Sequence, residues 1–263
     1  MLLLSHHRVE PAFRTGSCIV SQGDGPIALV SAGSRGIGAA IVRRLAASGW
    51  DVSFGYDGEE HSARKVEQAA REFGTRVTAI RVDMTDPAEV AAWVRQAGEQ
   101  LGPVEAAVSC AGIIRDRPPT LIQSAEWRSV TGLDGMFHLC RAAVLPMMRQ
   151  RSGRIVMVSS VVGVYGHVGD DLAAKPGIAG FARALAAQVS RFGIQVNAVT
   201  PGPVGRETAA VVPERTHASL TETIALRRFG SAAEVADLVA FLLSDQASDR
   251  TGTVFETRGS VLA

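Results

Sequence analysis

An acidic and a basic residue stand four positions apart at the start of a helical pattern. Asp171 precedes Lys175, and the pattern continues over residues 172–192. Side chains at this spacing share one face of a helix, so a carboxylate would meet an ammonium group. That neighbour would lower the pKa of Asp171 below its ordinary value of about 3.9. An ionised Asp171 cannot donate a proton, but it could act as a general base or form a structural salt bridge with Lys175.

Hydroxyl and imidazole groups precede this pair along the chain. Tyr165 follows Ser160 by five residues, and His167 comes shortly after. The phenol of Tyr165 is an alternative proton donor, and so is the imidazole of His167, whose ordinary pKa lies near neutrality. The simpler interpretation is that both side chains line a pocket wall or lie on an exposed loop.

A second candidate site is a glycine-rich turn near the start of the chain. A short apolar run, 27–32, predicts a buried strand, and the helical pattern after the turn begins at Ala39 and ends at Gly49. Such a turn lets the backbone approach a pyrophosphate, and the helix N-terminus supplies N–H donors and partial positive charge. The alternative is a tight turn that binds nothing. The candidate cofactor-binding residues of the turn are Gly33, Ser34, Arg35, Gly36, Ile37 and Gly38.

Two charged residues bear on which nicotinamide cofactor would bind. Arg35 could pair with a 2′-phosphate, which favours NADP(H). Asp57, at the end of the second strand pattern, would repel that phosphate if it pointed inward. Together, Arg35 and Asp57 favour NADP(H) slightly over NAD(H). If the binding site is fully degenerate, it would bind no cofactor.

The elements that must position these residues alternate along the chain. Apolar runs predict strands at 52–55, 77–82, 106–109, 155–159 and 195–199, with a last strand at 253–256. Helical patterns lie at 59–73, 87–101, 124–150, 172–192 and 232–243. Gly132 and Gly135, within the pattern at 124–150, are expected to bend that helix or to leave room beside a pocket. This alternation predicts an α/β fold with a single doubly wound parallel sheet and helices on both faces. Residues 1–25 lack periodicity and are expected to form a flexible extension before one domain at 26–263.

Composition excludes several classes of partner. The chain has 263 residues and a formal net charge of +1, which gives no reason to expect a nucleic acid or membrane partner. Its three cysteines show no metal-ligand spacing or disulfide framework, which indicates a reducing cytoplasm. The first residues form too short an apolar run for a signal peptide, and no stretch approaches the length of a membrane helix.

Residues 26–259 resemble the short-chain dehydrogenase/reductase family, most closely its 3-oxoacyl-[acyl-carrier-protein] reductases. The family's Thr-Gly-x-x-x-Gly-x-Gly pattern is similar to Ser31–Gly38, with Ala32 in place of the first glycine. Ser109-Cys110-Ala111-Gly112 stands where the family has Asn-Asn-Ala-Gly. Further similar phrases are Arg115-Asp116, Glu126-Trp127, Gly153-Arg-Ile-Val, Ser159-Ser-Val-Val-Gly and Arg227-Arg-Phe-Gly.

The resemblance implies a Rossmann-like domain and a set of site residues. Ser160 and Lys175 match the family's catalytic serine and lysine, but Asp171 occupies the position of the catalytic tyrosine and Gly132 that of the asparagine. The loop before Asp171 is also about two residues shorter than in the family. By the same resemblance Asp83 would contact the adenine ring, and the remaining cofactor contacts are Ala111, Gly112, Lys175, Pro201 and Gly202.

Three functional hypotheses follow. The first is a divergent NAD(P)H-dependent ketoreductase of a small-molecule or carrier-protein-bound acyl or polyketide ketone, with a non-standard proton donor. The second is a non-redox enzyme on the same scaffold, such as a cyclase, dehydratase or isomerase. The third is an inactive subunit paired with an active paralogue. The resemblance implies a homotetramer or dimer built through the long helices at 124–150 and 172–192.

Overall fold

The structure is a computed structural model of the whole chain. It describes residues 25–110, 133–159, 171–205, 221–222 and 224–257, with the backbone alone at 171–176. The predicted N-terminal extension therefore lies outside the described residues, apart from Gly25.

One sheet of seven parallel strands forms the centre of the described structure, in the order β3-β2-β1-β4-β5-β6-β7. The chain starts in the middle, builds outward through β2 and β3, then crosses back to add β4 beside β1. The bounds are β1 Ile27–Val30, β2 Asp51–Tyr56, β3 Val77–Arg81, β4 Val104–Ser109, β5 Gly153–Val158, β6 Ile194–Pro201 and β7 Val254–Thr257. The predicted doubly wound α/β fold is confirmed, including the last strand.

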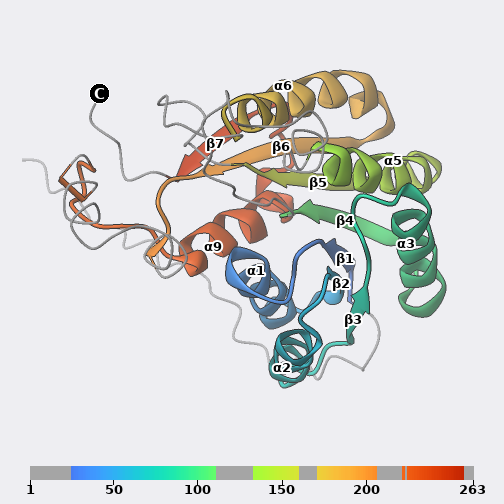
Figure 1. Ribbon diagram of the computed structural model, residues 1–263. Coiled ribbons are helices and arrows are strands. Elements are labelled where there is room, and N and C mark those ends of the chain that lie inside the picture. The colour runs from blue at the N-terminus through green and yellow to red at the C-terminus, as the bar shows by residue number, and fades with distance from the viewer. Residues whose placement is uncertain (1–24, 111–132, 160–170, 206–220, 223, 258–263) are drawn as a thin grey trace, which may run out of the picture.

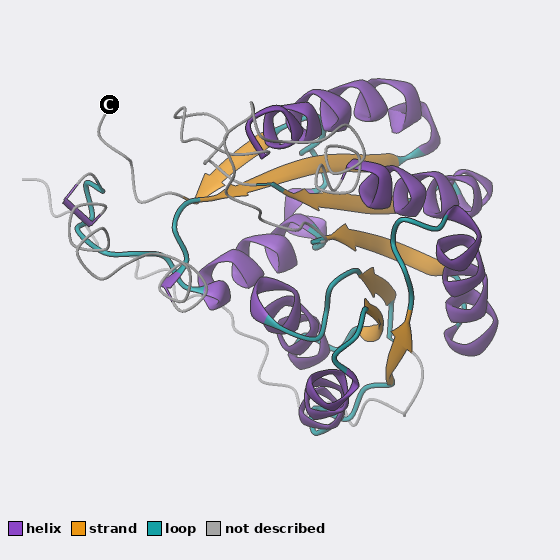
Figure 2. Cartoon of the chain, viewed as in Figure 1, coloured by secondary structure: helices purple, strands orange, loops and turns teal. Residues whose placement is uncertain are grey.

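Helices cover both faces of this sheet (Figures 1 and 2). Helices α1 (Gly36–Ala47), α2 (Glu60–Arg71) and α9 (Ala232–Leu242) pack on one face. Helices α3 (Pro87–Leu101), α5 (Leu133–Gln150) and α6 (Asp171–Val189) pack on the other. Two short 3₁₀ helices, η2 (Ser190–Phe192) and η3 (Asp245–Ala247), follow α6 and α9. The two cores are mainly aliphatic, with a few buried aromatic side chains, and form separate clusters divided by the sheet.

Two predicted bounds near the glycine turn are wrong. The first strand ends at Val30, not at residue 32, and the following helix begins at Gly36, not at Ala39. Ser31 and Ala32 leave the strand because Ala32 turns into the left-handed region, with φ 51°. Glycines carry no periodic signal, so the sequence did not reveal that two of them lie in the first helical turn.

A buried ion pair joins three elements at the amino edge of the sheet. The side chain of Asp51 is 2% exposed and accepts bonds from the backbone N–H (2.7 Å) and Nε (2.8 Å) of Arg76. Arg76 Nη2 also donates to the carbonyl oxygen of Leu101 at 2.8 Å. The start of β2, the start of β3 and the end of α3 are thereby tied together.

Candidate functional site

The turn between β1 and α1 lies at the carboxyl edge of the sheet, where the strand order reverses. β1 pairs with β2 on one side and with β4 on the other, so the turn opens over the gap where their crossover connections diverge. Ligands of doubly wound sheets bind at this switch point. The backbone N–H of Ser31 donates to the Val108 carbonyl (3.0 Å), and Ser31 Oγ accepts from the N–H of Cys110 (2.9 Å). Ser31 thus fixes the turn to the end of β4.

Glycine is required at two positions of this turn by close packing. A Cβ on Gly38 would lie 2.1 Å from the carbonyl oxygen of Ala32, and one on Gly33 would lie 2.6 Å from Cβ of Phe54. Gly36 adopts φ 57° and Ala32 φ 51°, both in the left-handed region. Ala32 stands where the family has glycine, and it keeps the backbone conformation that glycine adopts without strain.

The N-terminus of α1 is open. Its N-cap residue, Arg35, makes no side-chain capping bond, and the first turn contains no acidic residue. The first intrahelical bond runs from Ala39 N–H to the Arg35 carbonyl (3.0 Å), so the N–H groups of Gly36, Ile37 and Gly38 have no intrahelical acceptor. Unpaired donors and a helix dipole form an anion site. The turn therefore fits the pyrophosphate of a dinucleotide.

Charged side chains surround the neighbouring end of β2. Arg35 Nη1 lies 2.9 Å from Glu59 Oε1, and both side chains are mostly exposed. Asp57 is exposed and follows the last residue of β2. Glu59 was not predicted as a site residue, although the dinucleotide-binding pattern expects an acidic residue about 20 positions after the glycine turn. The run of carboxylates after β2 was a second signal.

Asp83 follows β3 and forms a local turn. Its Oδ1 accepts from the hydroxyl (2.7 Å) and the backbone N–H (2.8 Å) of Thr85. These two bonds, the hydroxyl first, lower the pKa of the Asp83 carboxyl below its ordinary value. Asp83 is exposed beside the predicted adenine position, and this ionised turn is compatible with the role that the resemblance implied.

Pro201 and Gly202 lie at the same edge. Pro201 ends β6, and the N–H of Gly202 donates to the Thr257 carbonyl at 3.1 Å. Asn197, further back in β6, donates from Nδ2 to the Arg250 carbonyl (2.9 Å) and accepts from the N–H of Thr253 (3.2 Å). Asn197 therefore braces the loop before β7.

Several predicted residues lie outside the described part of the chain: Ala111, Gly112, Gly132, Ser160, Tyr165 and His167. Asp171 and Lys175 fall in the first two turns of α6, one turn apart as predicted, without described side chains. Gly135, which was expected to bend α5 or leave room beside a pocket, allows close packing. A Cβ there would lie 2.9 Å from Cβ of Met84 in the β3–α3 connection.

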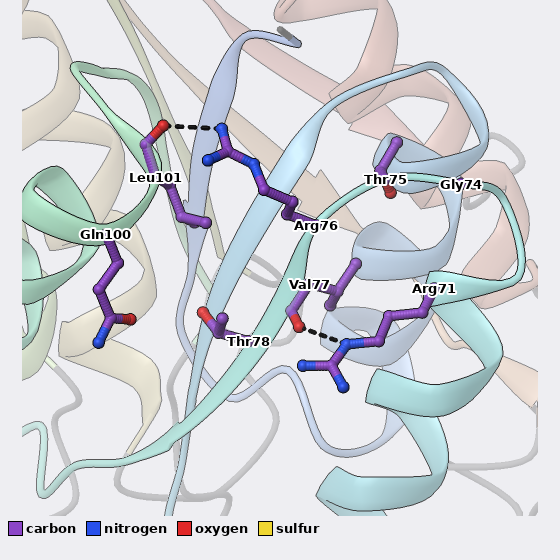
Figure 3. Close-up of a pocket in the computed structure, with 8 residues that line it drawn as sticks. All are labelled: Arg71, Gly74, Thr75, Arg76, Val77, Thr78, Gln100 and Leu101. Atoms are coloured by element: carbon purple, nitrogen blue, oxygen red, sulfur yellow. Dashed lines mark hydrogen bonds between the residues drawn. The ribbon is translucent and has the colours of Figure 1, made fainter. Parts of the chain in front are cut away.

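Two hollows occur among the described residues. One, of about 510 Å³, includes Asp57 and Asp83 in its lining and borders the carboxyl ends of β2 and β3. The other, of about 450 Å³, lies at the amino edge (Figure 3). Its arginines are engaged: Arg71 Nε donates to the Val77 carbonyl (2.9 Å), and Arg76 binds Asp51 and Leu101. The second hollow is therefore part of the structural edge and offers no free cation.

Neither a metal-binding cluster nor a membrane-spanning helix occurs in the part of the chain that the structure describes. No group of three or more His, Cys, Asp and Glu side chains is arranged there to hold a metal ion. None of the helices described is long and apolar enough to cross a membrane.

Comparison with known proteins agrees with this geometry. A family model described as enoyl-(acyl carrier protein) reductase matches residues 31–259. The chain is 35% identical to 3-oxoacyl-[acyl-carrier-protein] reductase FabG of Staphylococcus aureus (strain Mu50) over 238 residues, covering 89% of this chain and 97% of that protein. It is also 35% identical to FabG of Escherichia coli (strain K12) over 242 residues, covering 90% and 98%.

Solved structures give the same answer. A blue fluorescent protein from a metagenomic library, in complex with NADPH, superposes with a TM-score of 0.82 at 33% identity, covering 89% of this chain and 97% of that one. Actinorhodin polyketide ketoreductase with NADPH superposes with a TM-score of 0.84 at 30% identity, covering 90% and 97%. The glycine turn, the strand order and these relatives together establish that the chain belongs to the short-chain dehydrogenase/reductase family.

Proposed function

We propose that the chain is an NADP(H)-dependent ketoreductase of an acyl-thioester or polyketide-type ketone, and that its proton donor is not the residue four before Lys175. The observation that carries the proposal is the open N-terminus of α1 in a glycine turn at the switch point of the sheet. The FabG relatives and the polyketide ketoreductase support the reaction class. A carrier protein is the expected bearer of the substrate, and the cytoplasm the expected compartment.

The described residues would hold the cofactor by its phosphates. The N–H groups of Gly36, Ile37 and Gly38 would donate to the pyrophosphate, and Arg35 would pair with the 2′-phosphate. Asp83 would face the adenine, while Pro201 and Gly202 would border the nicotinamide. When bound, NADPH supplies a hydride to the carbonyl carbon of the ketone.

Residues of the β5–α6 stretch would complete the reaction. Ser160 would donate a hydrogen bond to the ketone oxygen, and Lys175 would hold the ribose. Tyr165 is the proposed donor of the proton that turns the developing alkoxide into an alcohol. Asp171 is not the proposed donor, because an aspartate four residues before a lysine in a helix is expected to be ionised near neutral pH and would repel the negative oxygen.

Binding and turnover test the proposal in two steps. Titration with NADPH should change its fluorescence, and addition of an acetoacetyl thioester should oxidise it. Tyr165→Phe should lower the turnover number about 100-fold or more, the usual range for losing a general acid. Asp171→Asn serves as the matched control and should change turnover much less.

Other outcomes identify the alternatives. Absence of NADPH binding would overturn the proposal. Turnover without nicotinamide that Asp171→Asn abolishes would indicate a non-redox enzyme. Binding without turnover, together with co-purification of a tyrosine-bearing relative, would indicate an inactive partner subunit.

The proposed assembly is a homotetramer or dimer that buries α5 and α6. Phe137 and Leu145 of α5 are 46% and 59% exposed, large values for such apolar side chains. Phe137 stacks edge-to-face on Phe181 of α6, with ring centroids 6.2 Å apart. A second copy would cover this surface, and analytical ultracentrifugation of the purified chain measures whether it does. A monomer at micromolar concentration would refute the assembly.

A further inference from the structure

The carboxylate of Glu59 already pairs with the guanidinium group of Arg35, beside the proposed cofactor site. Arg35 immediately precedes α1, and Glu59 immediately precedes α2, so the Nη1–Oε1 contact of 2.9 Å joins the starts of two neighbouring helices. The Arg35 side chain is 76% exposed and that of Glu59 52%. Exposed ion pairs contribute little to stability, so another anion can exchange with Glu59.

The segment that follows β2 is acidic and contains no cation. Three carboxylates, Asp57, Glu59 and Glu60, lie in the four residues that follow β2. The nearest arginine on α2, Arg64, is engaged with Glu60 (3.3 Å) and with Glu67 (2.9 Å). A phosphate that reached Arg35 would therefore replace one carboxylate and lie close to the others.

This corner is where a dinucleotide presents its ribose. In doubly wound sheets the ribose 2′ position lies near the carboxyl end of the second strand, where a carboxylate binds a hydroxyl and an arginine binds a phosphate. Arg35 and Glu59 meet at that end of β2. The pair therefore contains an arginine suited to the 2′-phosphate of NADP(H) and a carboxylate suited to the 2′-hydroxyl of NAD(H).

We infer that Glu59 is a specificity-determining residue, which holds Arg35 and so weakens binding of nucleotides that carry a 2′-phosphate relative to those with a 2′-hydroxyl. The inference rests on the proposed nicotinamide site. A 2′-phosphate has to displace the Glu59 carboxylate from Arg35 and then lie beside it, whereas a 2′-hydroxyl can donate a hydrogen bond to that carboxylate.

Nucleotide binding to Glu59→Gln tests the inference without catalysis. The probes are 2′,5′-ADP and ADP, measured by calorimetry, with NADPH and NADH measured by fluorescence. The variant should bind 2′,5′-ADP and NADPH about tenfold more tightly, as expected for removing one charge a few ångströms from a phosphate of charge about −1.5 to −2. Affinity for ADP and NADH should not increase. The tenfold gain should shrink in high salt, which screens exposed charges.

Glu60→Gln is the matched control, because it removes a neighbouring exposed carboxylate that pairs with Arg64 instead of Arg35. It should change the 2′,5′-ADP affinity less than Glu59→Gln does. In an Arg35→Ala background the effect of Glu59→Gln should also shrink, since the two residues act as a pair.

The outcomes separate the inference from the proposed function. Equal changes for phosphorylated and unphosphorylated nucleotides, equal effects of the two glutamine variants, or a full Glu59→Gln effect in Arg35→Ala would each overturn the inference alone. Failure of every nucleotide to bind the wild-type chain would overturn the proposed function and the inference with it.

Discussion

Helices α1 and α9 pack side by side on one face of the sheet, yet their N-termini are built in opposite ways (Figure 1). At α9, Ser231 Oγ accepts from the N–H of Glu234 (3.2 Å), and Glu234 Oε2 accepts from the N–H of Ser231 (2.7 Å). Arg228 holds the same carboxylate from outside, with Nη2 2.7 Å from Oε1. At α1, Arg35 caps nothing, and a strained Ala32 precedes it.

The open start of α1 differs from the capped starts of α9 and α3, although Glu59 at the start of α2 also makes no side-chain capping bond. Where the chain caps a helix it uses the usual residues, as at α3, where Asp86 accepts from the N–H groups of Ala88 and Glu89 and Pro87 takes the first position. Among the helices whose N-cap residues the structure describes, only α1 combines uncapped donors, a left-handed non-glycine residue and a position at the switch point of the sheet. The donors are therefore available to a ligand, at a cost in stability.

Removing the cap of α9 is expected to have the largest effect. Ser231→Ala loses one half of the reciprocal capping box, which should lower the free energy of unfolding by about 1–2 kcal/mol. Urea denaturation followed by circular dichroism measures this. Ser190→Ala, at an exposed serine that begins η2, is the control and should stay within about 0.5 kcal/mol. If Ser231→Ala left the free energy of unfolding unchanged, the stability of α9 would not depend on its capping box.

Relieving the strain beside α1 is expected to act in the opposite direction. Ala32→Gly should raise the free energy of unfolding by about 1 kcal/mol, because glycine adopts φ 51° without a Cβ clash. It should also tighten NADPH binding by removing a Cβ next to the phosphate turn. Ala40→Gly, in the interior of the same helix, should instead destabilise by about 1 kcal/mol. If Ala32→Gly lowered the free energy of unfolding, the left-handed conformation of Ala32 would not be strained.

The smallest effect is expected from removing Arg228, which pairs with the Glu234 carboxylate of the α9 capping box. Arg228, then the backbone and hydroxyl of Ser231, lower the pKa of Glu234 to about 2 from an ordinary 4.5. Because the folded pKa lies below the unfolded one, the contribution to stability is present above about pH 4.5. It is lost as the pH falls toward 2.

Arg228→Ala should therefore raise the pKa of Glu234 toward its ordinary value, as NMR titration of the side-chain carboxyl measures. The melting temperatures of variant and wild type should differ slightly at pH 6 and converge near pH 2. A difference that persists at pH 2 would indicate that Arg228 acts through contacts other than the Glu234 carboxylate.

Local signals allowed most of the fold to be predicted, and contacts between distant segments account for what was missed. The bounds of α3 were predicted correctly because Asp86 and Pro87 start the helix and Leu101 ends its apolar pattern. The end of β1 was not, because the geometry of Ser31 depends on Val108 in β4. The Arg35–Glu59 pair was missed for the same reason.

In the candidate site, too, local sequence signals were predictive and contacts between distant segments were not. The turn residues and Asp83 could be assigned from motif spacing, and the structure places them at one edge of the sheet. The uncapped state of α1 could not be predicted, since it depends on which side chains approach Gly36–Gly38 in space. The roles of Ser160, Tyr165, Asp171 and Lys175 stay predictions.

The bonds between Asp51, Arg76 and Leu101 have a consequence for how this sequence can diverge. They fasten β2, β3 and α3 at the edge of the sheet opposite the cofactor turn, where no proposed catalytic residue contributes. Substitutions at the carboxyl edge leave that anchor intact, so new chemistry can be tried there without unfolding the domain. Asp171, which we propose stands in the position of the family's catalytic tyrosine, would be the kind of change that such an anchored scaffold tolerates.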